Sequence, residues 1–149
     1  MAHMIHRAPG TTMSMSVAEM LGIEAVVSPL SLIRQIVMGL PLSAFERISE
    51  QMAPNDLAFR SQIIPRATWT RRKKSHHLSP SESEIVARLA QVWGRAVEVY
   101  HDLDAARRFL NQPHPLLEGR APIDVAVATS AGANLVESIL GRLLYGSAP

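Results

Sequence analysis

The residues best suited to chemistry in this 149-residue sequence form a basic run near its middle. Between Ile63 and Pro80 there is no acidic residue, while Lys and Arg occur five times and two threonines add hydroxyl groups. Such a cluster neutralises phosphates, and its hydroxyls can donate to phosphates or base edges. We predict a DNA contact made by Arg66, Thr68, Thr70, Arg71, Arg72, Lys73 and Lys74. A solvated basic segment has the same composition and stays open as the alternative.

Helix signals ahead of this run favour the DNA interpretation. Ser43 and Glu46 have the spacing of a capping box, which predicts a helix over 44–52. A second short helix is predicted to end before Pro65, and a third carries the basic residues. This is the order of a helix-turn-helix, whose last helix enters the major groove of DNA. We expect Trp69 to pack in the core rather than to stack on a base.

No residue set in the sequence has the spacing of a catalytic or metal site. His76 and His77 are adjacent, so on an extended segment their side chains point in opposite directions. The chain has no cysteine to complete a zinc site, and it lacks a glycine-rich phosphate loop and a nucleophile–base pair. We predict no metal, no cofactor and no enzymatic activity, with a small enzyme kept as an alternative class.

Capping signals and apolar spacing predict an all-α chain. The strongest start is Ser79-Pro80-Ser81-Glu82, a capping box with proline at the first helical position. A short helix is also expected between Pro29 and Gly39. The predicted parts are a flexible arm at 1–16 with a cloning remnant at 1–4, a helix-turn-helix region at 17–78, a long connecting core helix at 79–101 and a small helical domain at 102–149.

Two helices after Ser79 are predicted to bury one face each. On the long helix, Arg88, Arg95 and Glu98 are expected to point to water. The last helix is expected to be capped by Thr129 or Ser130. Its predicted core face consists of Leu135, Val136, Ile139, Leu140, Leu143 and Leu144.

The segment from Phe109 to Pro122 is predicted to be a loop of defined shape. Pro113 and Pro115 bracket His114, Gly119 follows, and Pro122 opens the next helix. A backbone specified this closely presents a surface. Near the start of the last helix, Gly132 allows another backbone to approach.

Composition sets the broad class of the protein. With 47% apolar and 19% charged residues, the chain can bury a core of its own. The absence of cysteine favours a reducing cytoplasm, and no apolar run of about 18 residues or secretion signal is present, so no membrane span is predicted. Residues 1–80 carry nine Lys and Arg against five acids, whereas 81–149 carry six against eight, so the two halves are expected to meet different partners.

The order of several short motifs resembles the Xre/MbcA/ParS-type antitoxins of RES-domain toxin–antitoxin modules. The similarity covers about residues 40 to 146, and Pro65 and Trp69 depart from the family pattern. The motifs are Ile64-Pro65-Arg66-Ala67-Thr68-Trp69-Thr70-Arg71-Arg72, Leu78-Ser79-Pro80-Ser81-Glu82-Ser83, Ala105-Ala106 with Phe109-Leu110, Pro113-His114-Pro115-Leu116, Gly119-Arg120, Pro122-Ile123-Asp124, Gly132-Ala133, Val136 and Leu140-Gly141-Arg142-Leu143 through Gly146.

The resemblance implies a type II antitoxin whose N-terminal region forms a homodimer and binds its own promoter. Its C-terminal region is implied to cover the NAD cleft of a RES-domain toxin that resembles ADP-ribosyltransferases and consumes NAD. The implied toxin-binding residues are Pro113, His114, Leu116, Gly119, Arg120, Pro122, Gly132, Arg142, Tyr145 and Gly146. For the prolines and glycines, fixing the backbone is the alternative role. A helix-turn-helix regulator without a toxin is the alternative function.

Overall fold

The computed structural model describes residues 16–23 and 28–146, and it confirms the predicted all-α class. In this described part of the chain, the only β-pairing is an isolated bridge between Pro41 and His77. Except for Ser16, the predicted arm at 1–16 lies outside the described residues. The helices are α1 (Val17–Leu21), α2 (Pro29–Met38), α3 (Leu42–Met52), α4 (Leu57–Ile63), α5 (Arg66–Ser75), α6 (Pro80–Tyr100), α7 (Leu103–Asn111), the 3-10 helix η1 (Pro115–Leu117), α8 (Pro122–Ala128) and α9 (Ser130–Leu144).

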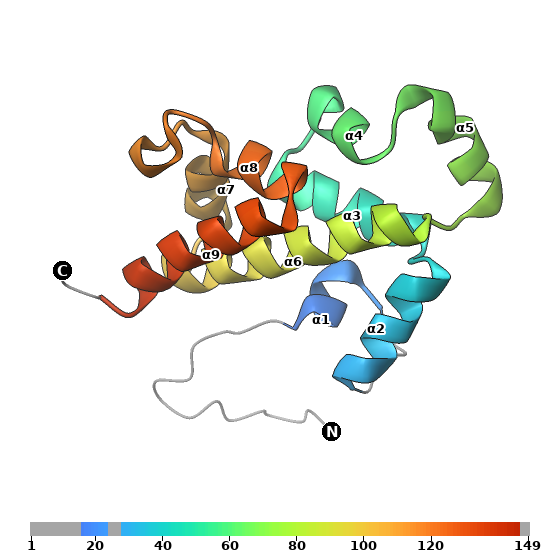
Figure 1. The fold of residues 1–149 in the computed structure, drawn as a ribbon, viewed down its shortest axis with the longest axis horizontal. Helices are drawn as coiled ribbons and strands as arrows, with labels where there is room; N and C mark the ends of the chain where they lie inside the picture. The colour runs from blue at the N-terminus through green and yellow to red at the C-terminus, as the bar shows by residue number, and fades with distance from the viewer. Residues whose placement is uncertain (1–15, 24–27, 147–149) are drawn as a thin grey trace, which may run out of the picture.

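The long helix α6 lies at the centre of the fold, and α9 runs beside it (Figure 1). The predicted capping box at its start is confirmed: the Ser79 hydroxyl accepts from the Glu82 amide at 3.1 Å, and the Glu82 carboxylate accepts from the Ser79 amide at 2.9 Å. One hydrophobic core extends from Met20 to Leu140 and includes the fully buried ring of Trp93. The N-terminal and C-terminal regions therefore share their packing. Within the described residues, no helix is long and apolar enough to span a membrane.

Arg88 of α6 does not point to water, so that prediction was wrong. Its guanidinium donates to the carbonyl oxygens of Ala126 at 3.1 Å and Val127 at 2.6 Å, at the end of α8. The last carbonyls of a helix lack partners within the helix, and a long basic side chain satisfies them. Sequence spacing along α6 does not reveal a partner 38 residues further along the chain.

The predicted capping box of Ser43 and Glu46 is also wrong. Helix α3 begins at Leu42, its N-cap is Pro41, and no side chain caps it. The Leu42 side chain is buried, and its amide donates to the carbonyl oxygen of His76 at 2.8 Å. Because a segment before α6 supplies this acceptor, the helix starts two residues earlier than the predicted start at residue 44. The predicted apolar face of this helix, Phe45, Ile48 and Met52, is fully buried.

Helix α9 buries a narrower face than predicted. Val136, Ile139 and Leu140 are buried, but Leu135 and Leu143 remain 47% and 52% exposed. The neighbours α6 and α8 cover only one side of the helix. The two leucines lie outside that contact, so they were wrongly assigned to the core.

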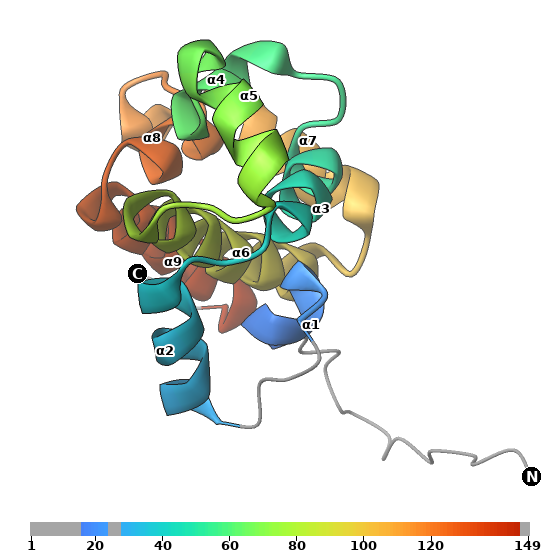
Figure 2. The same cartoon turned by 90° about the vertical axis from the view of Figure 1, so that its right-hand side faces the viewer.

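Helix α2 projects from the bundle (Figures 1 and 2). It begins after Ser28, which forms a capping box with Ser31, and it ends at Gly39 as predicted. The Gly39 φ angle is 101°, and a Cβ there would lie 2.3 Å from the Leu78 carbonyl oxygen. None of the residues of α2 is buried within its own chain.

Candidate functional site

Helix α5 presents the basic run at one end of the longest axis of the molecule (Figure 1). It follows α4 after a two-residue connection, Ile64-Pro65, with Pro65 as its N-cap. The side chains of Arg66, Thr70, Arg71, Lys73 and Lys74 are exposed, and Thr68 is half-buried. Within the part of the chain that the structure describes, the ion pairs involve none of the four exposed basic residues. Their positive charge is therefore available to a polyanion.

Arg72 faces the opposite way, toward α6. Its Nε donates to Glu82 Oε1 at 2.6 Å and its Nη2 to Oε2 at 3.2 Å, with the side chains 17% and 11% exposed. Burial raises the pKa of the Glu82 carboxyl, but hydrogen bonds from Arg72 and Ser79 outweigh burial and hold that pKa below its ordinary value. Arg72 thus joins α5 to the capping box of α6. A DNA contact by this residue stays a prediction that competes with an intramolecular role.

Trp69 attaches the other side of α5 to the core, as expected. Its ring packs edge-on to Phe45 with the centroids 5.8 Å apart. Pro65 and Trp69, the two residues that depart from the family's sequence pattern, therefore have structural roles: Pro65 is the N-cap at the start of α5, and Trp69 packs α5 against the core. His76 and His77 are exposed, and no group of three or more His, Asp or Glu side chains in the described ranges is placed to hold a metal ion.

The loop after α7 is organised by His114. Its Nδ1 accepts from the Leu116 amide at 3.1 Å, its amide donates to the Arg120 carbonyl at 3.0 Å, and its carbonyl accepts from the Gly119 amide at 3.1 Å. Gly119 has a φ of +81°, which favours glycine. Leu116 is 61% exposed, while Leu117 turns into the core. Of the predicted loop contacts, Pro113, Leu116, Gly119 and Arg120 are exposed, and His114 is half-buried.

Pro122 and Gly132 shape the backbone at the two ends of α8. Pro122 is buried at the first position of that helix. At Gly132, a Cβ would lie 2.1 Å from the Val125 carbonyl oxygen, so only glycine lets α9 start against α8. These two predicted contact residues therefore have a clear backbone role.

The outer face of α9 carries exposed side chains at helical spacing. Leu135, Ser138, Arg142 and Tyr145 follow one another at steps of three, four and three, and all are exposed. We call these four residues the α9 stripe. Sequence reasoning singled out Arg142 and Tyr145 but missed Leu135, because it was assigned to the core. The spacing with Arg142 was the signal that could have identified it. Gly146 follows the stripe, exposed, with a φ of +54°.

The two candidate surfaces lie far from each other. The loop around His114 and the C-terminal end of α9 lie at one end of the longest axis, whereas α5 lies at the other (Figure 1). Long helix α6 connects the two ends, with Arg72 bound at its start and α9 packed along its length. This arrangement allows two partners to bind at once.

Two family models match the chain, and together they span more than half of it. Residues 31–91 match the antitoxin Xre-like helix-turn-helix domain, which includes α4 and α5. Residues 95–146 match the antitoxin Xre/MbcA/ParS C-terminal toxin-binding domain, which includes the loop and the α9 stripe. The search of curated proteins found no match. The exposed basic helix and the C-terminal helices occur in the order of these two models, and the chain belongs to the Xre/MbcA/ParS antitoxins.

Proposed function

We propose that this antitoxin neutralises a RES-domain, NAD-consuming toxin by covering the NAD cleft with its C-terminal domain. The observation that carries the proposal is the α9 stripe, which puts Leu135, Arg142 and Tyr145 on one exposed face of the toxin-binding domain. Arginine and tyrosine are enriched at binding hot spots, and Leu135 adds apolar area beside them. The antitoxin acts by occlusion and performs no reaction itself. The exposed Leu116 and Arg120 of the loop add contact area at the same end of the molecule.

Co-expression with the RES-domain protein encoded next to this gene tests the proposal. Cells that produce both proteins should grow and keep their NAD, while cells with the toxin alone should stop growing and lose NAD. Arg142→Glu should weaken the complex about 30-fold or more, as expected for an arginine hot spot. Truncation after Leu140 should remove protection.

A matched variant at the other end of the molecule separates toxin binding from folding. Lys74 is exposed like Arg142, and its helix, α5, lies at the opposite end of the molecule from the C-terminal end of α9 (Figure 1). Lys74→Glu should leave protection intact. If soluble Arg142→Glu and the truncated protein each protect cells fully from the toxin, occlusion of the toxin by α9 is excluded. An adjacent gene without a RES-type toxin would favour a helix-turn-helix regulator that has no toxin.

We also propose that α5 binds the promoter of the antitoxin's own operon. Support comes from the exposed charges of Arg66, Arg71, Lys73 and Lys74, which share one helix of the helix-turn-helix domain. Arg71→Ala should weaken binding to a promoter fragment and reduce the slope of log K against log salt by about one, because one phosphate contact is lost. An unchanged slope would contradict a phosphate contact by Arg71.

We further propose a cytoplasmic homodimer formed through α2. Leu30, Ile33 and Val37 form a stripe at steps of three and four and are 55%, 54% and 63% exposed. A helix of ten residues is marginal on its own, and no residue of α2 is fully buried, since Ile36 packs only partly against the core. Arg34 is the only charged residue of α2, so the stripe suits an identical apolar stripe in a two-fold contact.

Sedimentation of the free antitoxin tests the dimer. Ile33→Glu should give a monomer at micromolar concentration, while Arg34→Glu, beside the stripe, should stay dimeric. A monomeric wild-type protein would rule out this contact.

A further inference from the structure

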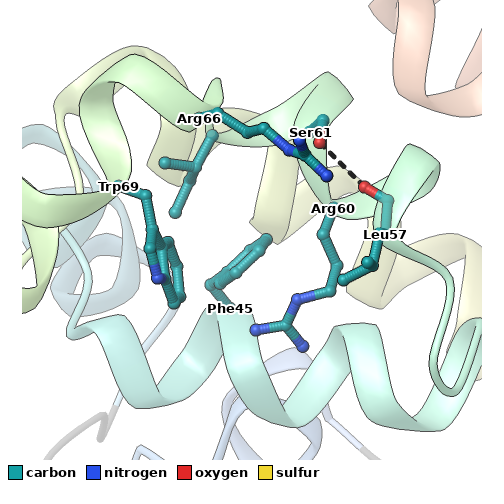
Figure 3. Close-up of a pocket in the computed structure, with 7 residues that line it drawn as sticks. Phe45, Leu57, Arg60, Ser61, Arg66 and Trp69 are labelled. Atoms are coloured by element: carbon teal, nitrogen blue, oxygen red, sulfur yellow. Dashed lines mark hydrogen bonds between the residues drawn. The ribbon is translucent and has the colours of Figure 1, made fainter.

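A small pocket lies at the joint between the two helices of the helix-turn-helix. Figure 3 shows its floor, Phe45 of α3, between Trp69 of α5 and Leu57 of α4. The pocket encloses about 180 Å³, and Ile64 from the connection completes its apolar wall. An apolar cavity of about 150 Å³ takes up benzene. The space therefore suits one six-membered ring or a short branched alkyl group.

Two guanidinium groups border this apolar space. Arg60 belongs to α4 and Arg66 to α5, and no acidic residue lines the pocket. The Arg60 guanidinium carbon lies 5.0 Å from the ring centre of Phe45 and 5.6 Å from that of Trp69. The rings thus hold the guanidinium in place by cation–π attraction. Neither arginine forms an ion pair with any residue that the structure describes.

We propose that this pocket binds a small organic carboxylate with an aromatic or short branched apolar body. The body would rest against Leu57, Ile64 and Trp69, and the carboxylate would accept hydrogen bonds from Arg60 and Arg66. Guanidinium groups match carboxylate geometry, and charge-assisted hydrogen bonds are the strong ones. The unpaired positive charge beside an apolar wall selects a ligand that has both features. This ligand site does not depend on the proposed toxin or promoter.

Ligand binding at this place has a consequence for α5. Arg60 and Leu57 come from α4, while Arg66 and Trp69 come from α5, so one ligand contacts both helices. A ligand that prefers one arrangement of the two helices increases the population of that arrangement. If DNA binds α5 as proposed and also prefers one arrangement, the ligand and DNA should change each other's affinity by the same factor. This coupling, unlike the ligand site itself, rests on the proposed promoter contact.

Titration of the full-length protein with phenylacetate tests the site, with binding followed by NMR shifts of the Trp69 indole. Phenylacetamide keeps the ring and removes the charge, and acetate keeps the charge and removes the ring. Phenylacetate should bind at least about tenfold more tightly than either, because charge-assisted hydrogen bonds and apolar burial both contribute. Equal binding of acetate, or of phenylacetamide, would overturn the proposal of an amphipathic carboxylate.

Variants locate the binding. Arg60→Met should weaken phenylacetate about tenfold or more, while Lys74→Met, which removes an exposed charge from α5 outside the pocket, should leave it unchanged. Leu57 is 64% exposed, so Leu57→Ala should keep the fold and still weaken phenylacetate severalfold. Unchanged phenylacetate affinity in Leu57→Ala and in folded Arg60→Met would refute the site. Two results together would show that the pocket receives a DNA phosphate instead: the wild-type protein does not bind phenylacetate, and Arg60→Met reduces the slope of log K for DNA binding against log salt.

Discussion

The Arg72→Met variant tests whether this arginine holds α5 on α6 or contacts DNA. Methionine keeps helix propensity and much of the volume but removes the guanidinium that binds both carboxylate oxygens of Glu82. Hydrogen bonds to charged groups contribute about 1.5–3 kcal/mol, and breaking a fully buried ion pair costs about 3–5 kcal/mol. Arg72 keeps 17% exposure and Glu82 11%, so some water reaches the carboxylate. We expect a loss of about 2 kcal/mol in the free energy of unfolding.

Urea unfolding followed by tryptophan fluorescence measures this loss. Arg71 is exposed on the same helix, so Arg71→Met should change the free energy of unfolding by less than about 0.5 kcal/mol. A cycle with Glu82→Gln should give a coupling energy of about 1–2 kcal/mol between the two side chains. The salt dependence of DNA binding should change in Arg71→Met and stay the same in folded Arg72→Met.

The effect of Arg72→Met should also depend on pH. Burial raises the pKa of Glu82, but the hydrogen bonds from Arg72 and Ser79 lower that pKa by more than burial raises it. The folded-state pKa therefore lies below the ordinary value. The stabilisation is therefore complete above the unfolded pKa of about 4.3 and is lost as the pH falls through the lower folded-state pKa. The difference between the wild type and Arg72→Met should shrink below about pH 4. A difference under about 0.5 kcal/mol at pH 7 would refute the structural role.

Two further predictions concern the C-terminal packing and the start of α6. Gly132→Ala should lower the free energy of unfolding by about 2 kcal/mol or more, because the added Cβ would lie 2.1 Å from the Val125 carbonyl oxygen. The control is Gly141→Ala, whose added Cβ meets no atom within 4 Å. It should stabilise the protein by about 0.5–1 kcal/mol in the same urea unfolding assay. Equal effects of the two alanines would contradict the close approach of α9 to α8. Ser79→Ala should cost about 1 kcal/mol in that assay, because its hydroxyl caps α6, and a neutral result would mean that another acceptor replaces it.

The distance between α5 and the α9 stripe gives the antitoxin two partner surfaces that do not overlap. Arg71 of α5 and Arg142 of α9 illustrate this separation, since both are exposed, and α5 and the C-terminal end of α9 lie at opposite ends of the longest axis (Figure 1). Under the proposed function, a toxin bound at α9 would leave α5 open to the promoter. Repression and neutralisation would then be compatible in one complex.

Helix order and family could be predicted from sequence, because their signals are local or depend on the order of short motifs. The capping box of Ser79 and Glu82 acts within one helical turn, so tertiary contacts were not needed to predict it. The Ser43 signal was equally local and failed, because His76 supplies a backbone acceptor that starts α3 at Leu42. A local signal therefore fails where a distant segment satisfies the same backbone groups.

Sequence by itself determined where most helices begin and end and which segment carries positive charge, because caps, prolines and glycines act on their immediate neighbours. The direction of each side chain was decided only by the tertiary structure. Arg72 turns to Glu82 while adjacent Arg71 stays in water, and Leu135 stays exposed while adjacent Val136 is buried. Neighbouring residues on a helix point about 100° apart, so the ion pair between α5 and α6 and the packing of α9 on α6 select which of them remains free for a partner.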